Sequence, residues 1–559
     1  MQHVSFNLID KPWIMVERLD GVTEEVSLRN LFAHAHEFRT VSGEMPIMYI
    51  SVLRLLLAVL YCTYGAVVSI GEILTSEILI KEWRHMYERG SFDMDAIGSY
   101  LDEVHEGFDL FGDRPFYQTA GLAYVAKNFD PASELIMDMP KPDKFLFSMR
   151  SNRDKVELSF SEATRCLLLN HGYDISGTKS PVIGNTNVKQ GKAYPPGGVV
   201  GTGWCGAIGG IFLEGENLFE TIMLNWVLVS GDNVLLGKSG DLAPWEREDA
   251  GSDAVVREPS GPVDLLTWQS RRTRLILNEQ GTAVVGMISC YGDSTRAADK
   301  NDCEIMTSWR ASVTQQKKLE TVHVPLMPIR PDSSRALWRG LSSLLQVNAS
   351  NGGEQSDLRA GVIKWADRLN NVLGWFPAVH RFVRVRAQGV SYGTRDCFVS
   401  DVVDDFIDLN RSMLRADSKT IGLSIDMVSR AEKAVQALVQ LASNVQLANG
   451  ADEPSIDIDI RERAYDELDG IFRRRLAFFG PDEDSVSYCN AWRDEIRTTI
   501  ERIARGVVSS GGLSAFRESD SMTAGRAISI FKTRLAAALA HVGGHDVPSA
   551  DEAIRGREE

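Results

Sequence analysis

The last third of the chain repeats apolar residues at helical spacing, and this pattern constrains the fold more than any other feature of the sequence. Apolar side chains recur at steps of three and four residues over 427–445, 492–507 and 528–542, and residues 460–479 have a helical composition. Turn-forming pairs separate the runs, namely Asn449-Gly450, Gly480-Pro481 and Gly511-Gly512. Four long helices with short connections are typical of an up-and-down bundle, so we expect a four-helix bundle over residues 402–559.

Residues 1–401 show no comparable period. Short strand-like runs, such as 274–276, 283–288 and 382–385, lie far apart among helical runs and loops rich in glycine and proline. A doubly wound domain would alternate strands and helices regularly, which this segment does not do. A chain of 559 residues also exceeds what one core normally holds. We therefore predict an α+β fold, with an irregular mixed domain over residues 1–401 followed by the bundle.

The apolar stretch over residues 48–74 approaches the hydrophobicity of a membrane span. Arg54 lies in its first third and no basic flank accompanies it, so a buried core helix is the better interpretation. Residues 1–20 carry charges where a signal peptide has its apolar core. Seven cysteines occur without a C-x-x-C pair, which disfavours a disulfide framework and a zinc site. We expect a cytoplasmic protein that contacts no membrane and holds no metal.

Residues 193–210 concentrate seven glycines and a proline pair in one segment. Within it, residues 201–206 read GTGWCG, which is the G-x-G-x-x-G spacing of dinucleotide-binding loops. Such a loop needs a buried strand before its first glycine, and here Pro195-Pro196 and Gly197-Gly198 occupy that place. The other use of bare glycine backbone is close approach to the surface of a ligand. We favour this second use, and a nucleotide site is the alternative.

The motifs of the common enzyme classes are absent from the sequence. No G-x-S-x-G, H-E-x-x-H or G-x-x-x-x-G-K-[ST] pattern occurs. His541 and His545 have the spacing of a helical metal pair, but Gly543-Gly544 between them would break the helix. Because a nucleophile, a metal set and paired acids are all missing, we predict a non-catalytic protein without a cofactor.

The formal net charge of −16 argues against a protein that binds nucleic acid over its whole surface. A local basic groove is compatible with that charge, because phosphate binding depends on where lysine and arginine cluster. Four clusters occur, namely Arg150, Arg153 and Lys155; Lys179, Lys189 and Lys192; Arg271, Arg272 and Arg274; and Arg381, Arg384 and Arg386. The last cluster leads into a turn at residues 391–395, which either projects into a groove or simply ends a hairpin.

Six segments of the chain, together with the glycine loop at 195–201 and the terminal helices, stand in the order of one known family. They read FNLIDKPWI, VSLRNLF, FDLFGDRPFYQT, WQSRRTRL, PLMPIRPDSSRALWRGL and VSYGTRD. In this order they resemble the large, CasA-type subunit of the type I-E CRISPR Cascade surveillance complex. The similarity spans nearly the whole chain, although each segment alone is only modestly specific.

The resemblance implies a non-enzymatic subunit that reads the short duplex motif beside the target (the PAM), while a guide RNA reads the target itself. In that family a glycine loop approaches the minor groove, and a wedge hairpin separates the strands where the R-loop begins. The positions that match these two elements are Gly197, Gly198 and Gly201 for the loop, and Tyr392, Gly393, Thr394 and Arg395 for the wedge. Weaker matches are Arg310 and Arg384 as basic DNA-binding residues, and Phe147 with Arg150 in a loop that seats the subunit in the assembly.

The resemblance also implies the partners of such a subunit. These are double-stranded target DNA, the CRISPR RNA-containing complex with its other Cascade subunits, and an effector helicase-nuclease that the subunit helps to recruit. Many relatives carry Asn or Gln at the wedge tip, where this chain has Thr394 and Arg395, so its preferred motif is expected to differ. Two alternatives stay open, a structural scaffold that does not read DNA and a nucleotide-binding enzyme that uses the GTGWCG loop.

Overall fold

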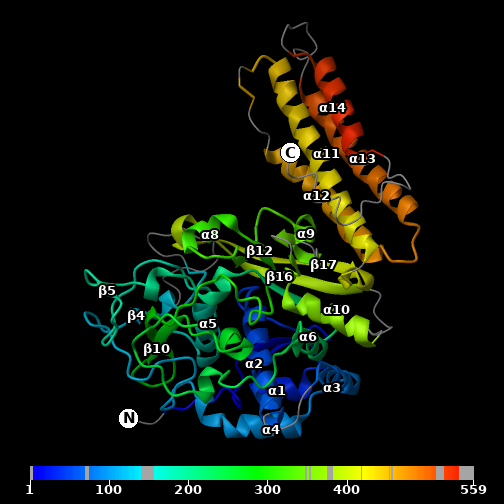
Figure 1. Cartoon of the computed structure of the whole chain (residues 1–559). Helices are drawn as coiled ribbons and strands as arrows, with labels where there is room; N and C mark the ends of the chain where they lie inside the picture. The colour runs from blue at the N-terminus through cyan, green and yellow to red at the C-terminus, as the bar shows by residue number, and fades with distance from the viewer. Residues whose placement is uncertain are drawn as a thin grey trace. The chain divides into compact units, whose positions relative to one another are not determined.

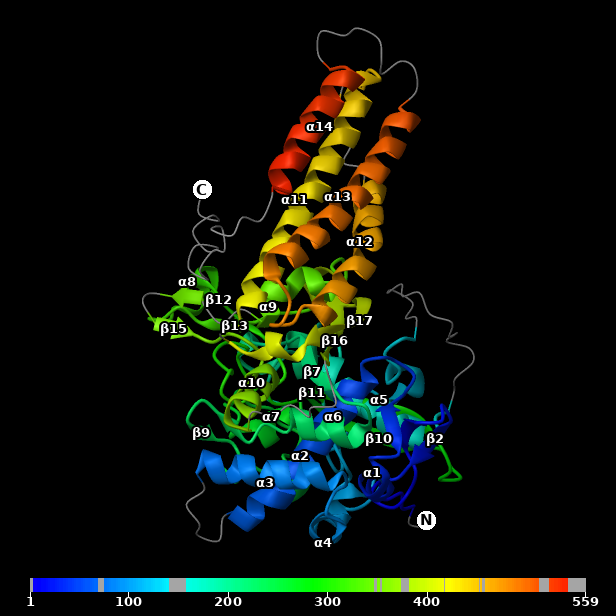
Figure 2. The same ribbon diagram turned by 90° about the vertical axis from the view of Figure 1, so that its right-hand side faces the viewer.

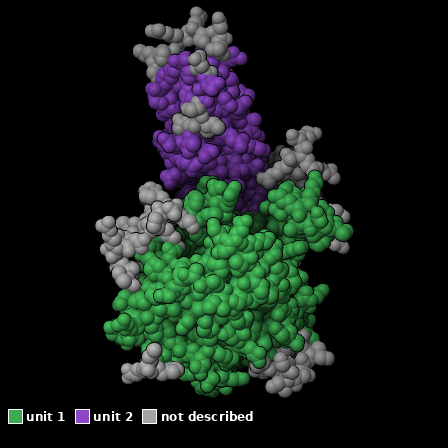
Figure 3. Space-filling view, turned by 90° about the vertical axis from the view of Figure 1, so that its left-hand side faces the viewer, with its two compact units in different colours: residues 1–334, 358–369, 385–405 green, residues 335–357, 370–384, 406–559 purple. Residues whose placement is uncertain are grey.

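The chain divides into two compact units, which Figure 3 distinguishes by colour. Unit 1 comprises residues 1–334, 358–369 and 385–405, and unit 2 comprises residues 335–357, 370–384 and 406–559. The computed structural model describes residues 4–68, 75–139, 157–345, 349–351, 354–373, 382–416, 418–451, 453–454, 458–511 and 522–540.

Unit 1 is built around the apolar helix α2, Met48–Val68, which packs against four other helices of the unit (Figure 1). These are α4 Met94–Glu103, α5 Phe160–Tyr173, α6 Leu218–Asn225 and α7 Pro262–Leu266. The remaining helices of the unit are α1 Leu28–His34, α3 Ser76–Arg89 and α8 Val313–Leu319. Side-chain caps fix where several of them begin, and at α5 the Ser159 hydroxyl accepts a hydrogen bond from the Glu162 amide.

In the described part of the chain, the strands form small sheets rather than one extended sheet. Three sheets have three strands each, in the orders β2-β1-β3, β10-β11-β4 and β17-β16-β7. Their strands are β1 Ile14–Arg18, β2 Thr23–Val26, β3 Phe38–Val41, β4 Asp130–Pro131, β7 Gly210–Glu214, β10 Arg271–Leu277, β11 Val284–Tyr291, β16 Phe382–Tyr392 and β17 Val399–Asn410. Two-stranded pairs are β5 Val188–Lys189 with β6 Lys192–Ala193, β8 Val229–Ser230 with β9 Asn233–Val234, β12 Trp309–Ala311 with β13 Leu326–Pro328, and β14 Ala349–Asn351 with β15 Glu354–Ser356.

Helix α2 covers residues 48–68 of the apolar stretch that the sequence singled out, and residues 69–74 lie outside the described residues. Among the described residues it is the one helix that passes for a membrane span by length and composition, and 83% of the window Met48–Gly65 is buried inside the protein. Its arginine is neutralised within the core, because Arg54 donates from Nη1 to Glu304 Oε1 at 2.9 Å and from Nη2 to Glu304 Oε2 at 3.0 Å. A buried bidentate pair of this kind lets a core helix carry a charge. The prediction of a core helix agrees with this burial.

Unit 2 contains the predicted helical bundle (Figure 2). Helix α11, Lys419–Ala448, packs against α12 Ile458–Phe478, α13 Ser485–Ser510 and α14 Ala524–Ala538. The apolar positions at helical spacing are buried, among them Met427, Leu438, Trp492, Ile500 and Leu535. The unit also contains the short helix α9, Leu341–Leu345. The mixed α+β class and the helical C-terminal part are therefore confirmed.

The start of the bundle differs from the sequence prediction. The predicted boundary between residues 401 and 402 falls inside strand β17, and the first bundle helix begins at Lys419. The acidic residues after 401 are held in the strand, because Asp404 pairs with Arg386 at 2.7 Å across the sheet. Helix α10, Gly361–Leu373, and strands β16 and β17 each contribute residues to both units.

Candidate nucleic-acid interface

A four-residue segment at the C-terminal end of α5 joins the glycine loop to the turn between β16 and β17, and we call residues 173–176 the anchor segment. The Tyr173 carbonyl accepts a hydrogen bond from the Tyr392 hydroxyl at 2.7 Å, and the Asp174 carbonyl accepts one from the Gly203 amide at 2.8 Å. The Ser176 amide donates to the Asp396 carbonyl at 2.8 Å. Two segments that lie nearly 200 residues apart in the chain are therefore fastened to the same short stretch of backbone.

The Asp174 side chain fixes the anchor segment electrostatically. Its carboxylate accepts hydrogen bonds from Lys179 Nζ and Arg271 Nε, both at 2.6 Å. Burial alone would raise the pKa of Asp174, but the charges of Lys179 and Arg271 outweigh that effect and hold this pKa well below its usual range. Arg271 also donates from Nη2 to the Gly201 carbonyl at 2.9 Å, so the same guanidinium holds the glycine loop.

The three glycines predicted for the loop occupy different environments. Gly197 and Gly198 are exposed and have φ angles of +61° and +64°, in the left-handed region that favours glycine. A Cβ atom on Gly198 would meet nothing within 4 Å, whereas one on Gly197 would come within 2.7 Å of Val256 Cγ2. A Cβ atom on Gly201 would collide with the Ser176 hydroxyl. Gly198 is thus open to a ligand, and Gly201 is a packing contact with the anchor segment.

The GTGWCG motif is filled by the protein itself. A Cβ atom on Gly203 would collide with the backbone of Gly172, and one on Gly206 would collide with the Tyr392 hydroxyl. Trp204 is buried and donates from Nε1 to Glu304 Oε2 at 2.7 Å. The segment Trp204–Ala207 is a single 3-10 turn rather than the opening of an α-helix. These glycines serve packing, and the geometry does not fit a phosphate cradle.

The turn between β16 and β17, which we call the wedge turn, covers residues 393–397. The Gly393 amide donates to the Phe398 carbonyl at 3.0 Å, and a Cβ atom on Gly393 would collide with the Phe398 ring. Thr394 and Arg395 are exposed at the tip. Arg395 and Asp396 have φ angles of +59° and +54°. Left-handed backbone costs a non-glycine residue about 1–2 kcal/mol, and strain of this kind collects at functional sites.

The Tyr392 side chain points into unit 1, towards the anchor segment, and does not project from the wedge turn. Its hydroxyl is bonded to the anchor segment and lies against Gly206. Burial raises the pKa of Tyr392 well above its usual value, so the phenol stays neutral. The exposed part of the predicted wedge is therefore Thr394 and Arg395.

The other residues predicted to contact DNA or the assembly are not bonded to the anchor segment in the described part of the chain. Arg310 is exposed on β12 in unit 1. Arg384 belongs to unit 2, where Asp408 pairs with it at 2.8 Å and its guanidinium lies 4.2 Å from the centre of the Phe406 ring. That pairing offsets the charge which a DNA contact would use. Phe147 and Arg150 lie outside the described residues.

Sequence reasoning missed the basic residue nearest to the wedge turn. Arg330 lies 3.3 Å from Asp396 through Nη1 and Oδ1, and its Nε donates to the Ala207 carbonyl at 3.4 Å. Arg330 lies two residues after the end of β13. The next residue, Pro331, packs against Gly389 and Gly209. The segment PLMPIRPDSSRALWRGL carried part of the family resemblance, but nothing in its spacing placed Arg330 beside a turn 66 residues later.

Two arginines that the sequence grouped as a surface cluster are buried. Arg271 pairs with Asp174, and Arg272 pairs with Asp293 at 2.6 Å. The two arginines are neighbours on β10 and therefore point to opposite faces of the strand, and both faces are covered at this end of β10. These two residues are therefore unavailable to a local basic groove, because carboxylates inside unit 1 already neutralise them.

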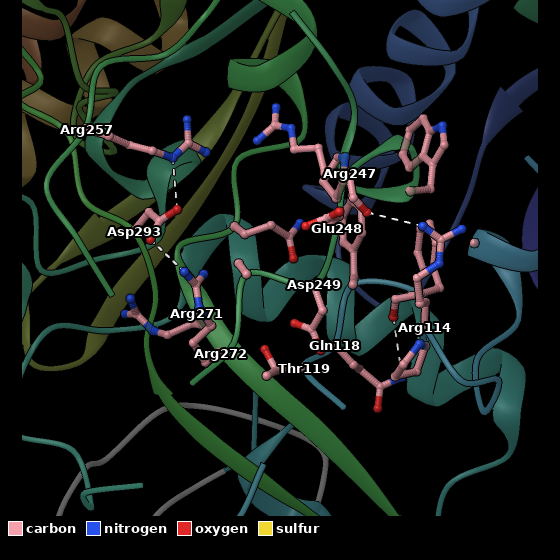
Figure 4. Close-up of a pocket in the computed structure, with 18 residues that line it drawn as sticks. Arg114, Gln118, Thr119, Arg247, Glu248, Asp249, Arg257, Arg271, Arg272 and Asp293 are labelled. Atoms are coloured by element: carbon pink, nitrogen blue, oxygen red, sulfur yellow. Dashed lines mark hydrogen bonds and ion pairs between the residues drawn. The ribbon is translucent and has the colours of Figure 1, made fainter. Parts of the chain in front are cut away.

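A pocket of about 90 Å³ lies beside these arginines in unit 1. Figure 4 shows Asp293 between Arg257 and Arg272, which bind it at 2.9 Å and 2.6 Å. Asp264, adjacent to the pocket, pairs with Arg257 and with Arg247 at 2.7 Å. The described residues contain no group of three or more histidine, cysteine, aspartate or glutamate side chains that would hold a metal ion. Four of the arginines that line the pocket, Arg247, Arg257, Arg271 and Arg272, are paired with carboxylates, and these ion pairs stabilise its wall.

Comparisons with known proteins bear on the whole chain. Residues 7–504 match the family model described as CRISPR-associated protein Cse1. The solved structure of Thermobifida fusca Cse1 is 33% identical and superposes with a TM-score of 0.85, over 96% of this chain and 98% of that one. Cse1 from Acidimicrobium ferrooxidans is 26% identical, with a TM-score of 0.78 over 96% and 99% of the two chains.

More distant structures share the fold. CasA from Thermus thermophilus is 21% identical, with a TM-score of 0.69 over 96% of this chain and 99% of that one. A search of curated proteins found no match. The family model covers well over half of the chain, and the Thermobifida fusca relative exceeds 30% identity over nearly its full length. The chain therefore belongs to the CRISPR-associated Cse1 family, the CasA-type large subunits of type I-E Cascade.

Proposed function

We propose that this protein is the non-catalytic subunit of a CRISPR RNA-guided complex that contacts the duplex motif beside the target. In this proposal Gly197 and Gly198 approach the minor groove with bare backbone, and the wedge turn enters the duplex and starts strand separation. The observation that carries the proposal is the anchor segment, which holds both elements within one small region of unit 1.

The exposed backbone of the glycine loop suits the dimensions of DNA. The minor groove is about 6 Å wide, and a backbone segment without side chains can approach its floor closely. Gly198 is exposed and has nothing within 4 Å of its Cβ position, so the backbone at this position can approach such a groove without a side chain or a neighbouring residue in the way. Minor-groove contacts distinguish little beyond A·T from G·C, and we therefore expect the subunit to accept several flanking motifs.

The free energy needed to begin strand separation is small enough for a short turn to supply. Opening one base-pair step costs about 1.4 kcal/mol, and guide RNA pairing takes over after the first steps. A small rigid tip is sufficient for this task, and the wedge turn is held on both sides by Gly393 and by the anchor segment. The exposed Arg395 would then contact a phosphate or a displaced base.

The partners in this proposal are double-stranded target DNA, the CRISPR RNA with the other Cascade subunits, and an effector helicase-nuclease. Structures that share this fold at 16% identity bear the titles "CRISPR RNA-guided surveillance complex" and "CRISPR RNA-guided surveillance complex, pre-nicking". A scaffold subunit that never touches DNA is the competing function. It predicts that changes at Gly198 and Arg395 leave DNA binding by the complex unaltered.

The test compares two isosteric substitutions in the reconstituted complex. Asn and Asp both tolerate left-handed backbone, and both side chains would extend into open space at position 198. Gly198→Asp adds a negative charge that phosphates repel, so we expect binding of flanked duplex targets to weaken at least about tenfold relative to Gly198→Asn. Gel-shift titrations on targets that differ only in the flanking motif measure both affinity and motif preference.

The matched control is Gly21→Asp. Gly21 is exposed, has a φ angle of +84° and has nothing within 4 Å of its Cβ position, so this substitution adds the same charge in the same kind of backbone. It should bind DNA like the unsubstituted protein. Affinities and motif preferences of Gly198→Asp and Gly198→Asn that both equal those of the unsubstituted protein would refute the glycine-loop assignment.

A further inference from the structure

The hairpin that precedes the glycine loop carries two lysines directly opposite each other, and we call residues 188–193 the basic hairpin. Strands β5 and β6 pair so that Lys189 faces Lys192, across a turn in which Gln190 and Gly191 have φ angles of +50° and +71°. Both lysines are exposed. Within the described part of the chain, neither ammonium group has an ion pair or a hydrogen bond.

This pairing is unfavourable for the isolated protein. Side chains opposite each other on an antiparallel pair share one face, with Cβ atoms about 5 Å apart, and like charges in that position destabilise the pair. A nearby acidic side chain would relieve this repulsion. The chain has 76 acidic residues, but none of the described ones pairs with either lysine. Two unscreened lysines on one face instead form a site that gains free energy when an anion binds between or beside them.

The basic hairpin is held firmly enough to present these charges. Ala193 is fully buried in a cluster with Leu122, Tyr124 and Ile288, and Val188 packs against the same cluster. Ala193 and Lys179 exchange two backbone hydrogen bonds, of 3.0 Å and 3.1 Å. The hairpin therefore moves with the body of unit 1 rather than as a free loop.

The basic hairpin also leads directly into the glycine loop. The Tyr194 amide donates to the Asn187 carbonyl at 3.0 Å, and the Gly198 amide donates to the Pro195 carbonyl at 3.1 Å, so hydrogen bonds fix the path from hairpin to loop. Phosphates border the minor groove on both sides, and a protein segment that enters the groove brings its neighbours onto them. The lysines lie six to nine residues from Gly198 along this path.

We propose that Lys189 and Lys192 bind backbone phosphates of the duplex beside the flanking motif. This inference rests on the proposed function, because it places the phosphates through the groove contact of Gly197 and Gly198. The contact is independent of base sequence, so it contributes affinity and orientation rather than motif preference.

The experiment measures how DNA affinity depends on salt in the reconstituted complex. Each phosphate contact contributes about 0.9 to the slope of log affinity against log salt, so Lys189→Gln/Lys192→Gln should lower the slope by about 1.8. The affinity deficit of the double variant should therefore shrink by about twelvefold between 50 and 200 mM salt. Motif preference should not change, and Lys189→Arg/Lys192→Arg should retain the slope of the unsubstituted protein.

The charge control is Lys11→Gln/Lys81→Gln, which removes two exposed lysines elsewhere in unit 1 and should leave the slope unaltered. A salt slope for the basic-hairpin variant equal to that of the unsubstituted protein overturns the inference. Loss of the variant subunit from the purified complex, with an unaltered slope for the complexes that do assemble, also overturns it and assigns the lysines to a protein partner. If the slope falls while Gly198→Asp has no effect, the lysine contact stands and the flanking-motif function fails.

Discussion

Gly198, Arg395 and Asp396 share a left-handed backbone at the exposed edge of the candidate interface, with φ angles of +64°, +59° and +54°. Glycine adopts this conformation without cost, but each of the other two residues gives up about 1–2 kcal/mol. Hydrogen bonds from the Ser176 amide to the Asp396 carbonyl and from the Asp396 amide to the Gly393 carbonyl hold the wedge turn in place. The contacts that fix the wedge turn thus also maintain its strain.

At the residue scale, His171 makes the stability of unit 1 depend on pH. It lies on α5 two residues before the anchor segment, and its Nε2 is bonded to the Tyr117 carbonyl at 2.8 Å. Burial, together with the charges of Arg271 and Arg272, lowers the pKa of His171 to about 4, although the nearby Asp174 acts in the opposite direction. The unfolded chain binds this proton near pH 6.5, so the contribution of His171 to stability is complete above that pH and is lost as pH falls towards 4.

The test compares the unfolding free energy of the unsubstituted protein with that of His171→Gln between pH 7 and pH 4. The amide of the variant still donates to Tyr117 but does not titrate. We expect the unsubstituted protein to lose about 3 kcal/mol more than the variant over this range, measured by denaturant unfolding. Parallel pH profiles for the two proteins would contradict the burial of a neutral His171.

At the scale of elements, the anchor segment couples three parts of unit 1, namely α5, the glycine-rich segment and strand β16. The most direct contact is that of Gly206 with the Tyr392 hydroxyl, which leaves no room for a Cβ atom. The same hydroxyl donates to the Tyr173 carbonyl. The position of the wedge turn therefore depends on glycine at 206 as well as on the residues of the turn itself.

This contact predicts a coupling energy between two substitutions. Gly206→Ala should cost about 1–3 kcal/mol because the new methyl group collides with Tyr392. Tyr392→Phe should cost about 1–2 kcal/mol through the lost hydrogen bond. Phenylalanine removes the oxygen, which is the nearest colliding atom, but keeps ring carbons 2.8 Å and 2.9 Å from the new methyl group. Because the collision is relieved in part, the double variant should be more stable than the sum of the single changes by about 1 kcal/mol, as measured in a double-mutant cycle.

The control for this cycle is Gly422→Ala in α11, where a Cβ atom would meet nothing within 4 Å. Alanine favours helix at an exposed position, so this change should stabilise the protein by up to about 1 kcal/mol and add independently to Tyr392→Phe. Strict additivity for Gly206→Ala and Tyr392→Phe would mean that the two residues do not touch.

At the scale of the whole molecule, helical periodicity predicted the bundle well because it reports local burial. The apolar positions of α11 and α13 that recur at steps of three and four are buried. In α14 the prediction holds for Phe531 and Leu535, whereas Ile528 is half-buried and Val542 lies outside the described residues. The predicted bundle start was too early, because acidic residues of β17 such as Asp404 are stabilised by partners on the neighbouring strand β16. Pairing across a sheet leaves no local signal in one sequence.

The candidate site was only partly accessible to sequence reasoning. Glycine composition located Gly198, and the family resemblance located the wedge turn, but neither gave the inward orientation of Tyr392 or the burial of Arg271. Arg330 was missed because its contact with Asp396 depends on tertiary structure alone. The anchor segment had no motif, since it acts mainly through backbone carbonyl and amide groups that every residue possesses.

Site-specific crosslinking in the reconstituted complex tests the central claim most directly. A photoreactive amino acid is placed at position 198 or at position 395 in the full-length protein, with position 21 as the control, and the complex is irradiated on duplex targets. The account predicts that position 198 crosslinks to nucleotides of the flanking motif, that position 395 crosslinks at the first target base pairs, and that position 21 gives neither product. Crosslinks from 198 and 395 only to protein subunits, or none above the level at position 21, would contradict it.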